Sequence, residues 1–544
     1  MLCDPVTPSS QPSDLRVAKA TALLVLSMGL VAFAILWQIS GHQTLTEQAL
    51  ARGQLGSGRV LRAALELGQM GVTIDPRVFG DNPREAAGLL SYSRAGGEDR
   101  TASFPSTEHG LRLPGEGPTF DLLSIVIDPR DWRGENGIFD NSQKRGTNWE
   151  RGACITLFSG GQPVAESTVG LRVHGGASRR GDVKSLRIYL VAEYGATVAS
   201  GDLLPGAVGD SLVVHSDQRR LRFCNPISYE LMALLGCDVP KTRPVRVMIN
   251  GELLLRTFFL SEHLSASHIE AKLGHEHFVR VDEQGGHHAL QDRLIVRLRD
   301  FAPALSELDR LVDVDDVITW LAGVLFCAPY DCRQGVAFCD SRDQRWHWLV
   351  WDLDWSFGPW PERVSGQVIK DRNIVAYLDH NWGDIRTAIF TQYMAVEGEF
   401  RARLLARVTR ALNHELTPKW LESLIEKYRG IARQCSPGDM KPQRNLDSIA
   451  AFMVARPKIL REELNAVYAV GPVHSCTVRV ATATSVRIDG YEYRSDWLGH
   501  YFTGQEMAVT AGAGFGLTVN GVAVAGHNWR GTITANTVVD VIPR

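Results

Sequence analysis

Residues 346–358 read WHWLVWDLDWSFG, and they place Asp352 and Asp354 directly after an apolar run rich in tryptophan. Residues 346–352 have the composition of a β-strand, and two residues at i and i+2 point to the same side if the chain stays extended. An ionised carboxylate is costly to bury unless another group compensates its charge. We therefore expect either a metal ion that binds both acids, or a turn at which they pair with nearby arginines.

The length and composition of the chain bound the possible classes of protein. A chain of 544 residues, 44% hydrophobic and 22% charged, predicts a globular protein of two or three domains. Nucleic-acid-binding proteins usually carry an excess of basic residues, whereas this chain has a formal net charge of −3. We therefore expect no nucleic-acid partner. The nine cysteines form no CxxC pair, so they predict neither a zinc site nor a disulfide-rich scaffold.

One segment near the N-terminus predicts a location. Residues 20–37 read ATALLVLSMGLVAFAILW without a charge, after Arg16 and Lys19. That length is enough to cross a bilayer, and the basic residues before it favour a cytoplasmic N-terminus. We expect a single-pass anchor in the cell membrane at residues 20–40, with residues 1–19 cytoplasmic and the rest of the chain extracytoplasmic. A cleaved secretory signal is the alternative.

The remainder predicts three parts. Residues 41–117 have the character of a juxtamembrane stalk, and residues 118–470 alternate strand and helix signals. Residues 471–544 contain short alternating runs of Val, Thr and Gly, which predict a small β-sandwich-like module. The predicted class is therefore α+β. The break at Gly471-Pro472 predicts that few contacts cross between the last two parts.

Two stretches carry basic residues close to turns. Residues 170–190 read GLRVHGGASRRGDVKSLRIYL, in which a Gly-rich turn and Lys184 suit an anionic ligand, although a plain hairpin explains them as well. Residues 216–236 read SDQRRLRFCNPISYELMALLG, with Arg222 ahead of a helix expected to cap at Asn225. These arginines suit either a phosphate or plain solvation.

Acidic residues follow at three later places. Residues 248–264, MINGELLLRTFFLSEHL, predict an Asn-Gly hairpin whose second strand delivers Glu262. Asp331 ends an apolar stretch, and Asp352 and Asp354 come after the next strand signal. Phosphoryl transfer needs a cation for the phosphate charge, carboxylates to hold Mg²⁺, and an acid that accepts a hydroxyl proton. The order of these residues matches that need.

Five ordered stretches resemble motifs of the CotH kinase family, secreted protein-kinase-like proteins named after a spore-coat protein. WDLDWSFG is similar to the most recognisable string of that family. The other four stretches are GIFDNSQKRGTNWERGACITLF (137–158), GLRVHGGASRRGDVKSLRIYL (170–190), CNPISYELMALLG (224–236) and INGELLLRTFFLSEHL (249–264). The resemblance spans residues 118–470.

The resemblance implies an atypical protein-kinase-like core that binds ATP and Mg²⁺. It implies that Lys184 contacts the nucleotide phosphates, that Asp331 is the catalytic-loop acid, and that Asp352 or Asp354 is a metal ligand. Three further residues are candidates for the nucleotide site on the same ground: Arg187, Arg222 and Glu262. The choice between Asp352 and Asp354 stays open.

The chain also departs from the family pattern. Gln334 and Gly335 stand where the family has asparagine after the catalytic acid, and Gln334 would offer Mg²⁺ an oxygen from a longer side chain. Phe223-Cys224-Asn225 replaces Leu-Arg-Asn, with the arginine moved to Arg222. Two functions follow: a membrane-anchored, extracytoplasmic kinase that phosphorylates Ser or Thr of an envelope or secreted protein, or a catalytically weak pseudokinase that acts in surface binding or adhesion.

Overall fold

The computed structural model describes residues 121–160, 162–216, 221–282, 298, 303–332, 334–358, 363–364, 367–368, 373–380, 384–396, 398–435, 440–480 and 484–543. The predicted cytoplasmic segment 1–19, anchor 20–40 and stalk 41–117 lie outside these residues. Within the part that is described, no helix combines the length and the apolar character that crossing a membrane requires.

The chain divides into two compact units. The first contains the residues up to Arg172 together with Leu190–Val198 and Val245–Leu255, and the second contains the remainder. Strands β3, β6 and β7 run from one unit into the other.

In the first unit, the apolar strand β1 pairs with one antiparallel and one parallel neighbour. Strand β1 pairs antiparallel with β2 and parallel with β6, and β2 pairs antiparallel with β3. Leu123, Ile125 and Ile127 of β1 are fully buried. The elements are β1 (Asp121–Ile127), α5 (Pro129–Trp132), η3 (Thr147–Trp149), β2 (Arg151–Ser159), β3 (Gln162–His174), η5 (Ala192–Tyr194) and β6 (Thr242–Ile249). Asn250-Gly251 has positive φ at both residues, so the predicted Asn-Gly turn is present.

The second unit begins with antiparallel strand pairs. Strand β5 pairs antiparallel with β4 and with β7, and β10, β9 and β8 form a three-stranded antiparallel sheet in that order. The elements are η4 (Ala177–Arg180), β4 (Ser185–Tyr189), α6 (Ser200–Leu203), β5 (Ser211–His215), α7 (Cys224–Leu234), β7 (Glu252–Glu262), α8 (Ala266–Leu273), β8 (Phe278–Asp282), β9 (Gly335–Asp340), β10 (Trp346–Val350), and the short pair β11 (Arg363–Val364) and β12 (Gln367–Val368).

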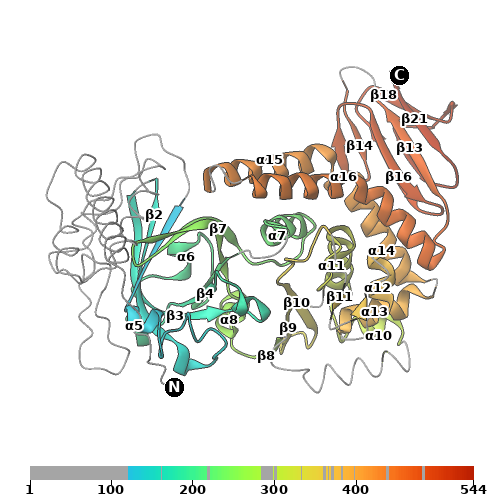
Figure 1. Ribbon diagram of the computed structural model, residues 1–544. Coiled ribbons are helices and arrows are strands. Elements are labelled where there is room, and N and C mark those ends of the chain that lie inside the picture. The colour runs from blue at the N-terminus through green and yellow to red at the C-terminus, as the bar shows by residue number, and fades with distance from the viewer. Residues whose placement is uncertain are drawn as a thin grey trace, which may run out of the picture. The chain divides into compact units, whose positions relative to one another are not determined.

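Helices surround a large apolar core in the same unit. Helix α11 is buried along almost its whole length, because eleven of its fourteen residues are apolar or small and inaccessible. Its N-cap Asp313 accepts a hydrogen bond from the Asp316 amide. The helices are α10 (Leu305–Leu308), α11 (Val314–Cys327), α12 (Ile374–Asp379), α13 (Ile385–Met394), α14 (Glu399–Arg410), the π-helix η6 (Ala411–Glu415), α15 (Pro418–Cys435) and α16 (Lys441–Tyr468) (Figure 1).

The C-terminal residues form two sheets over one core, the arrangement that their alternating composition predicts. One sheet has the order β16-β13-β21-β18-β19 and the other β15-β14-β17-β20 (Figure 1). The core includes Cys476, Val509 and Val539. The strands are β13 (Val473–Arg479), β14 (Val486–Ile488), β15 (Tyr491–Tyr493), β16 (Trp497–Phe502), β17 (Glu506–Ala511), β18 (Phe515–Val519), β19 (Val522–Ala523), β20 (Asn528–Thr532) and β21 (Thr537–Pro543).

The π-helix η6 joins this module closely to the helices, and the expectation of few contacts across Gly471-Pro472 is wrong. His414 of η6 stacks between Tyr491 and Trp497, with ring centroids 4.7 and 5.2 Å away. Its Nδ1 lies 2.8 Å from the Tyr493 hydroxyl. A composition break shows where the chain changes its local pattern, but it carries no information about which side chains later pack together.

Candidate functional site

The two acids of the WDLDW segment lie on a turn and not on an extended strand. Strand β10 ends at Val350, and Asp352 has a φ of +52°, in the left-handed region. Asp354 is 6% exposed, whereas Asp352 is half-buried. The condition for i and i+2 residues to share one side is therefore not met.

Helix α7 holds this turn in place. The Asp352 amide donates to the Tyr229 hydroxyl oxygen at 3.0 Å, and Asn225 Nδ2 donates to Asp352 Oδ1 at 3.4 Å. Cys224 Sγ lies 3.5 Å from the Ser356 carbonyl oxygen. Two sequence motifs that are far apart along the chain thus meet at Asp352.

The expected N-cap at Asn225 is wrong. Helix α7 begins at Cys224, with Phe223 as N-cap at a φ of 72°, and Asn225 is the second helical residue. The Asn225 side chain turns to Asp352 and is not used for capping. Sequence rules for helix starts weigh only local hydrogen bonds, and here a long-range partner takes the amide.

The segment that carries Asp331 lies against the same turn. Helix α11 ends at Cys327, whose carbonyl oxygen accepts from the Phe357 amide at 2.8 Å. The Tyr330 amide donates to the Trp355 carbonyl at 3.3 Å. These backbone bonds fix the residue before Asp331 to the loop that follows Asp354.

Gln334 and Gly335 show how the chain departs from the asparagine pattern. Gln334 Nε2 donates to Asp331 Oδ2 at 2.5 Å, so the amide orients the predicted catalytic acid. Gly335 has a φ of +149°, and a Cβ there would lie 2.9 Å from the Leu349 carbonyl oxygen. Asparagine is therefore excluded at position 335 by the close strand β10, while position 334 still supplies an amide side chain.

Three aromatic rings bring two further motifs to this turn. His174 directly precedes the Gly175-Gly176 turn, His263 ends the Ser-Glu-His segment, and Trp351 precedes Asp352. Their ring centroids lie 5.5 Å apart for the two histidines and 6.1 Å from each histidine to Trp351. Three of the other four family-like stretches therefore contact the WDLDWSFG stretch at residues 351–357.

Each of the three predicted cationic residues donates hydrogen bonds to other groups of the protein. Lys184 is buried, and its Nζ donates to the carbonyl oxygens of Arg179 at 2.7 Å and Gly181 at 2.6 Å. Arg187 donates to Ser211 Oγ at 2.9 Å. The backbone amide of the buried Arg222 donates to Asn445 Oδ1 at 3.2 Å. The Gly-rich turn thus orders the Lys184 ammonium group through backbone carbonyls.

The Glu262 carboxylate accepts hydrogen bonds from backbone amides. Its two carboxylate oxygens accept from the amides of Val208 at 2.9 Å and Lys241 at 2.8 Å. Burial lowers the pKa of the neighbouring His268 more than the Glu262 charge raises it, so that imidazole is neutral. The role of Glu262 in nucleotide binding stays a prediction.

The oxygen atoms near Asp352 fit a hard cation. Asn225 Oδ1 is buried and has no hydrogen-bond partner among the described residues, although its amide already contacts Asp352. Carboxylate and amide oxygens are the donors that Mg²⁺ prefers, and Mg²⁺ in kinases takes further ligands from phosphate and water. The described side chains do not include a cluster of three or more His, Cys, Asp or Glu suited to a metal.

Sequence reasoning missed Asn225 and Tyr229 as partners of Asp352. Both belong to the CNPISYELMALLG motif, and their i,i+4 spacing puts them on one helix face. That spacing is the signal by which they could have been found. The hydrogen bonds described above join Asp331 to Gln334, Lys184 to Arg179 and Gly181, and Asp352 to Asn225 and Tyr229.

A family model matches the later part of the chain, which contains the WDLDWSFG stretch. Residues 283–466 match the family described as CotH kinase protein, a range that includes Asp331, Gln334, Asp352 and Asp354. Among solved structures, the crystal structure of a Helicobacter pylori proinflammatory kinase, CtkA, is similar at 9% identity and a TM-score of 0.27, over 64% of this chain and 99% of that chain. None of the curated proteins compared with the chain matches it. The resemblance to the CotH family is confirmed over residues 283–466, and the four stretches before residue 283 lie outside the matched range.

Proposed function

We propose that this chain, which carries a CotH kinase domain over residues 283–466, is an ATP- and Mg²⁺-dependent kinase that phosphorylates Ser or Thr of an envelope or secreted protein. One observation carries the proposal. The Asp331 segment and the Asp352 turn are joined by backbone hydrogen bonds, and helix α7 fixes the second of them. Two acids held on adjoining loops suit a reaction that needs one acid for the acceptor and another for the metal.

Asp331 has the role of accepting the proton of the acceptor hydroxyl. The 2.5 Å hydrogen bond from Gln334 orients its carboxylate and leaves the other oxygen for the acceptor. Asp352, with Asn225 Oδ1 beside it and Asp354 two residues on, would hold Mg²⁺. When bound, the cation would supply positive charge against the phosphate oxygens. Lys184 would add a point charge to the nucleotide phosphates.

Substitution of Asp331 tests this assignment. Asp331→Asn keeps the shape and removes the base, so transfer of the γ-phosphate should fall by about 10²- to 10⁴-fold, while ATP affinity measured by calorimetry should change little. Asp315→Asn is the matched control, since Asp315 lies on the exposed face of α11. Wild-type transfer that survives in Asp331→Asn would contradict the assignment.

Two observations favour a pseudokinase as the second candidate. Gln334 replaces the family asparagine and bonds to the catalytic acid, and Glu262 is held by backbone amides. A pseudokinase that acts as a surface binding protein would raise its melting temperature with ATP and Mg²⁺ but transfer no phosphate. The two measurements on one preparation separate the candidates.

We also propose that residues 20–40 anchor the protein in the cell membrane with the kinase domain outside. An uncharged run preceded by Arg16 and Lys19 supports this orientation. Protease added to intact cells should then digest the kinase domain, and the mature N-terminus should lie at or near Met1. A mature N-terminus after the apolar run would replace the anchor with a secretory signal.

A further inference from the structure

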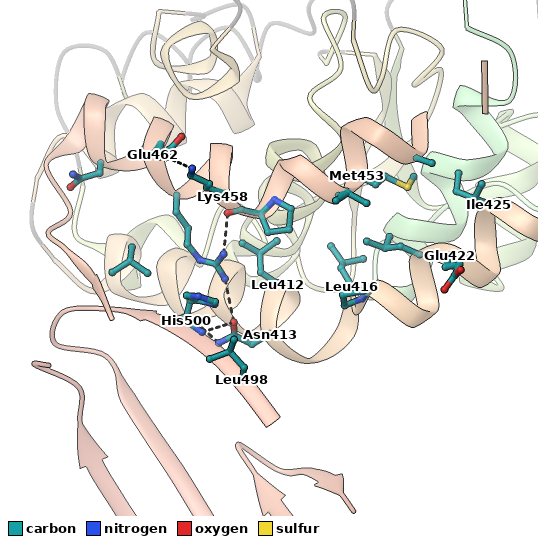
Figure 2. A pocket seen from close by; sticks show the side chains of 18 of the residues that line it. Leu412, Asn413, Leu416, Glu422, Ile425, Met453, Lys458, Glu462, Leu498 and His500 are labelled. Atoms are coloured by element: carbon teal, nitrogen blue, oxygen red, sulfur yellow. Dashed lines mark hydrogen bonds and ion pairs between the residues drawn. The ribbon is translucent and has the colours of Figure 1, made fainter. Parts of the chain in front are cut away.

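A cavity of about 940 Å³ lies between helices α15 and α16, the π-helix η6 and strands of the C-terminal module. Most of its wall is apolar, with Leu412, Leu416 and Met453 labelled along it in Figure 2. Small-molecule pockets typically measure about 300–1,000 Å³, with apolar walls and a few placed polar groups. None of the predicted kinase-site residues lines this cavity, so it is a separate site.

One cation in the wall, Arg461, forms no ion pair with the residues that the structure describes. Arg461 of α16 donates through Nη1 to the Pro457 carbonyl at 3.1 Å and through Nη2 to Asn413 Oδ1 at 3.2 Å. Its Nε is buried and has no hydrogen-bond partner among the described residues, none of which forms an ion pair with Arg461. Burial lowers the pKa of Arg461 to about 10. Within the described part of the chain, the charge is therefore bonded to two neutral oxygens and to no carboxylate, and a partly buried charge of this kind is stabilised by an added anion.

The surroundings of Arg461 are fixed by the fold. Asn413 belongs to η6, and it also accepts from the His500 amide at 3.0 Å and donates to the His500 carbonyl at 3.1 Å. Burial lowers the pKa of the His500 imidazole, and the Arg461 charge lowers it further, so that ring is neutral. Figure 2 shows Asn413 and His500 next to each other at one end of the cavity. π-helical turns occur often at functional sites.

We propose that this cavity binds a single-chain amphiphile with a carboxylate head group, a ligand of the fatty-acid class. The carboxylate would lie against Arg461, because a guanidinium group pairs with a planar carboxylate more specifically than other cations do. The hydrocarbon chain would lie along Leu412, Leu416 and Met453. Two other cations line the cavity, but Lys458 pairs with Glu462, and Arg429 pairs with Glu426 and Asp447. Among the described residues this leaves the Arg461 charge for a ligand, which suits a single carboxylate better than a polyanion such as a nucleotide. The proposal does not depend on phosphotransfer.

Calorimetric titration of the full-length protein with dodecanoate tests it, at concentrations below the onset of micelles. We expect saturable binding at one site per chain. Dodecyltrimethylammonium has the same chain and the opposite charge, and it should bind at least about tenfold more weakly. Absence of saturation, or equal binding of the two probes, would overturn the proposal.

A pair of variants on one helix locates the head group. Arg461→Met should weaken dodecanoate binding by about tenfold or more. Arg444→Met is the matched control, since Arg444 is exposed on α16 and does not line the cavity, and it should bind as the wild type does. Equal affinity in Arg461→Met and the wild type would refute the assignment.

A second position covers the case in which Arg461→Met does not fold. Val454 lines the cavity but is 82% exposed, so Val454→Asp should leave folding intact, as a melting curve will show. The added negative charge should weaken dodecanoate binding and leave dodecyltrimethylammonium binding unchanged or stronger. Unchanged dodecanoate affinity in Val454→Asp would refute the proposal.

Discussion

Two aspartates with the same unusual backbone are surrounded very differently. Asp352 beside helix α7 has a φ of +52°, and Asp489 in the hairpin between β14 and β15 has a φ of +48°. The Asp489 carboxylate accepts from the Ala508 amide at 2.8 Å, the Tyr501 hydroxyl at 2.5 Å and His414 Nε2 at 3.3 Å. The Asp352 carboxylate accepts one long bond, from Asn225 at 3.4 Å, within the described part of the chain.

The difference separates a structural acid from a candidate functional one. Asp489 precedes Gly490 in a two-residue turn, where an Asp-Gly pair readily adopts positive φ. Its carboxylate already accepts three hydrogen bonds from the protein. Asp352 has no glycine after it and sits on an irregular loop held by Tyr229. Strained backbone together with an acid that still has lone pairs to offer is typical of a binding site.

The largest expected effect is on catalysis at Asp352. Asp352→Asn removes the negative charge of this metal ligand and should lower the rate of phosphate transfer by about 10³-fold, as loss of an electrostatic ligand does. Its melting temperature should stay near the wild-type value without ATP, because only one weak hydrogen bond to the carboxylate is altered. A rise in melting temperature on adding ATP and Mg²⁺ should be lost.

Asp354→Asn completes this experiment. If the metal ligand is Asp354, the rise in melting temperature on adding ATP and Mg²⁺ will be lost in Asp354→Asn and kept in Asp352→Asn. If neither variant changes the rise, both acids are structural and the contrast with Asp489 fails.

The second effect is on the stability of the C-terminal module. Asp489→Ala leaves a buried histidine, a tyrosine hydroxyl and a backbone amide without their acceptor, and it should cost about 3 kcal/mol of unfolding free energy. Denaturant unfolding measures this loss. Asp496→Ala is the control, since Asp496 is exposed in the same module and accepts a single bond from Val480.

The pH dependence of this contribution has a definite sign. Burial alone would raise the pKa of Asp489, but hydrogen bonds from His414, Tyr501 and Ala508 lower it below the ordinary 3.8. A lowered pKa means that the stabilisation is present above pH 3.8 and is lost as the pH falls through the folded-state value. The difference between wild type and Asp489→Ala should therefore shrink in strong acid. A difference that grows in acid would show that the carboxylate is not held as an anion.

The same contrast explains how much could be predicted from the sequence. Apolar alternation located β10, and composition predicted the β-rich residues after 471, because both depend on local pattern. The left-handed turn at Asp352 and the insertion of His414 between Tyr491 and Trp497 could not be predicted. Each depends on partners far along the chain, Tyr229 in the first case and the module strands in the second. The family motifs named the acids but not the residues that hold them.

The smallest effect comes from the two tyrosines that support these aspartates, and it tests the comparison most directly. Tyr229 accepts from the Asp352 amide, and Tyr501 donates to the Asp489 carboxylate. Each hydroxyl is one partner of one hydrogen bond to an aspartate, so Tyr229→Phe and Tyr501→Phe should each cost about 1–2 kcal/mol of unfolding free energy.

Their effects on activity should nevertheless differ. Tyr229→Phe frees the Asp352 turn, which should lower kcat with little change in the binding of the acceptor protein, since the acid is mispositioned but still present. Tyr501→Phe should leave phosphate transfer unchanged, because it acts on a carboxylate that joins the C-terminal module to η6 and is not part of the candidate kinase site. Equal losses of kcat in the two variants would mean that lowered stability, and not the geometry at Asp352, accounts for the fall in activity.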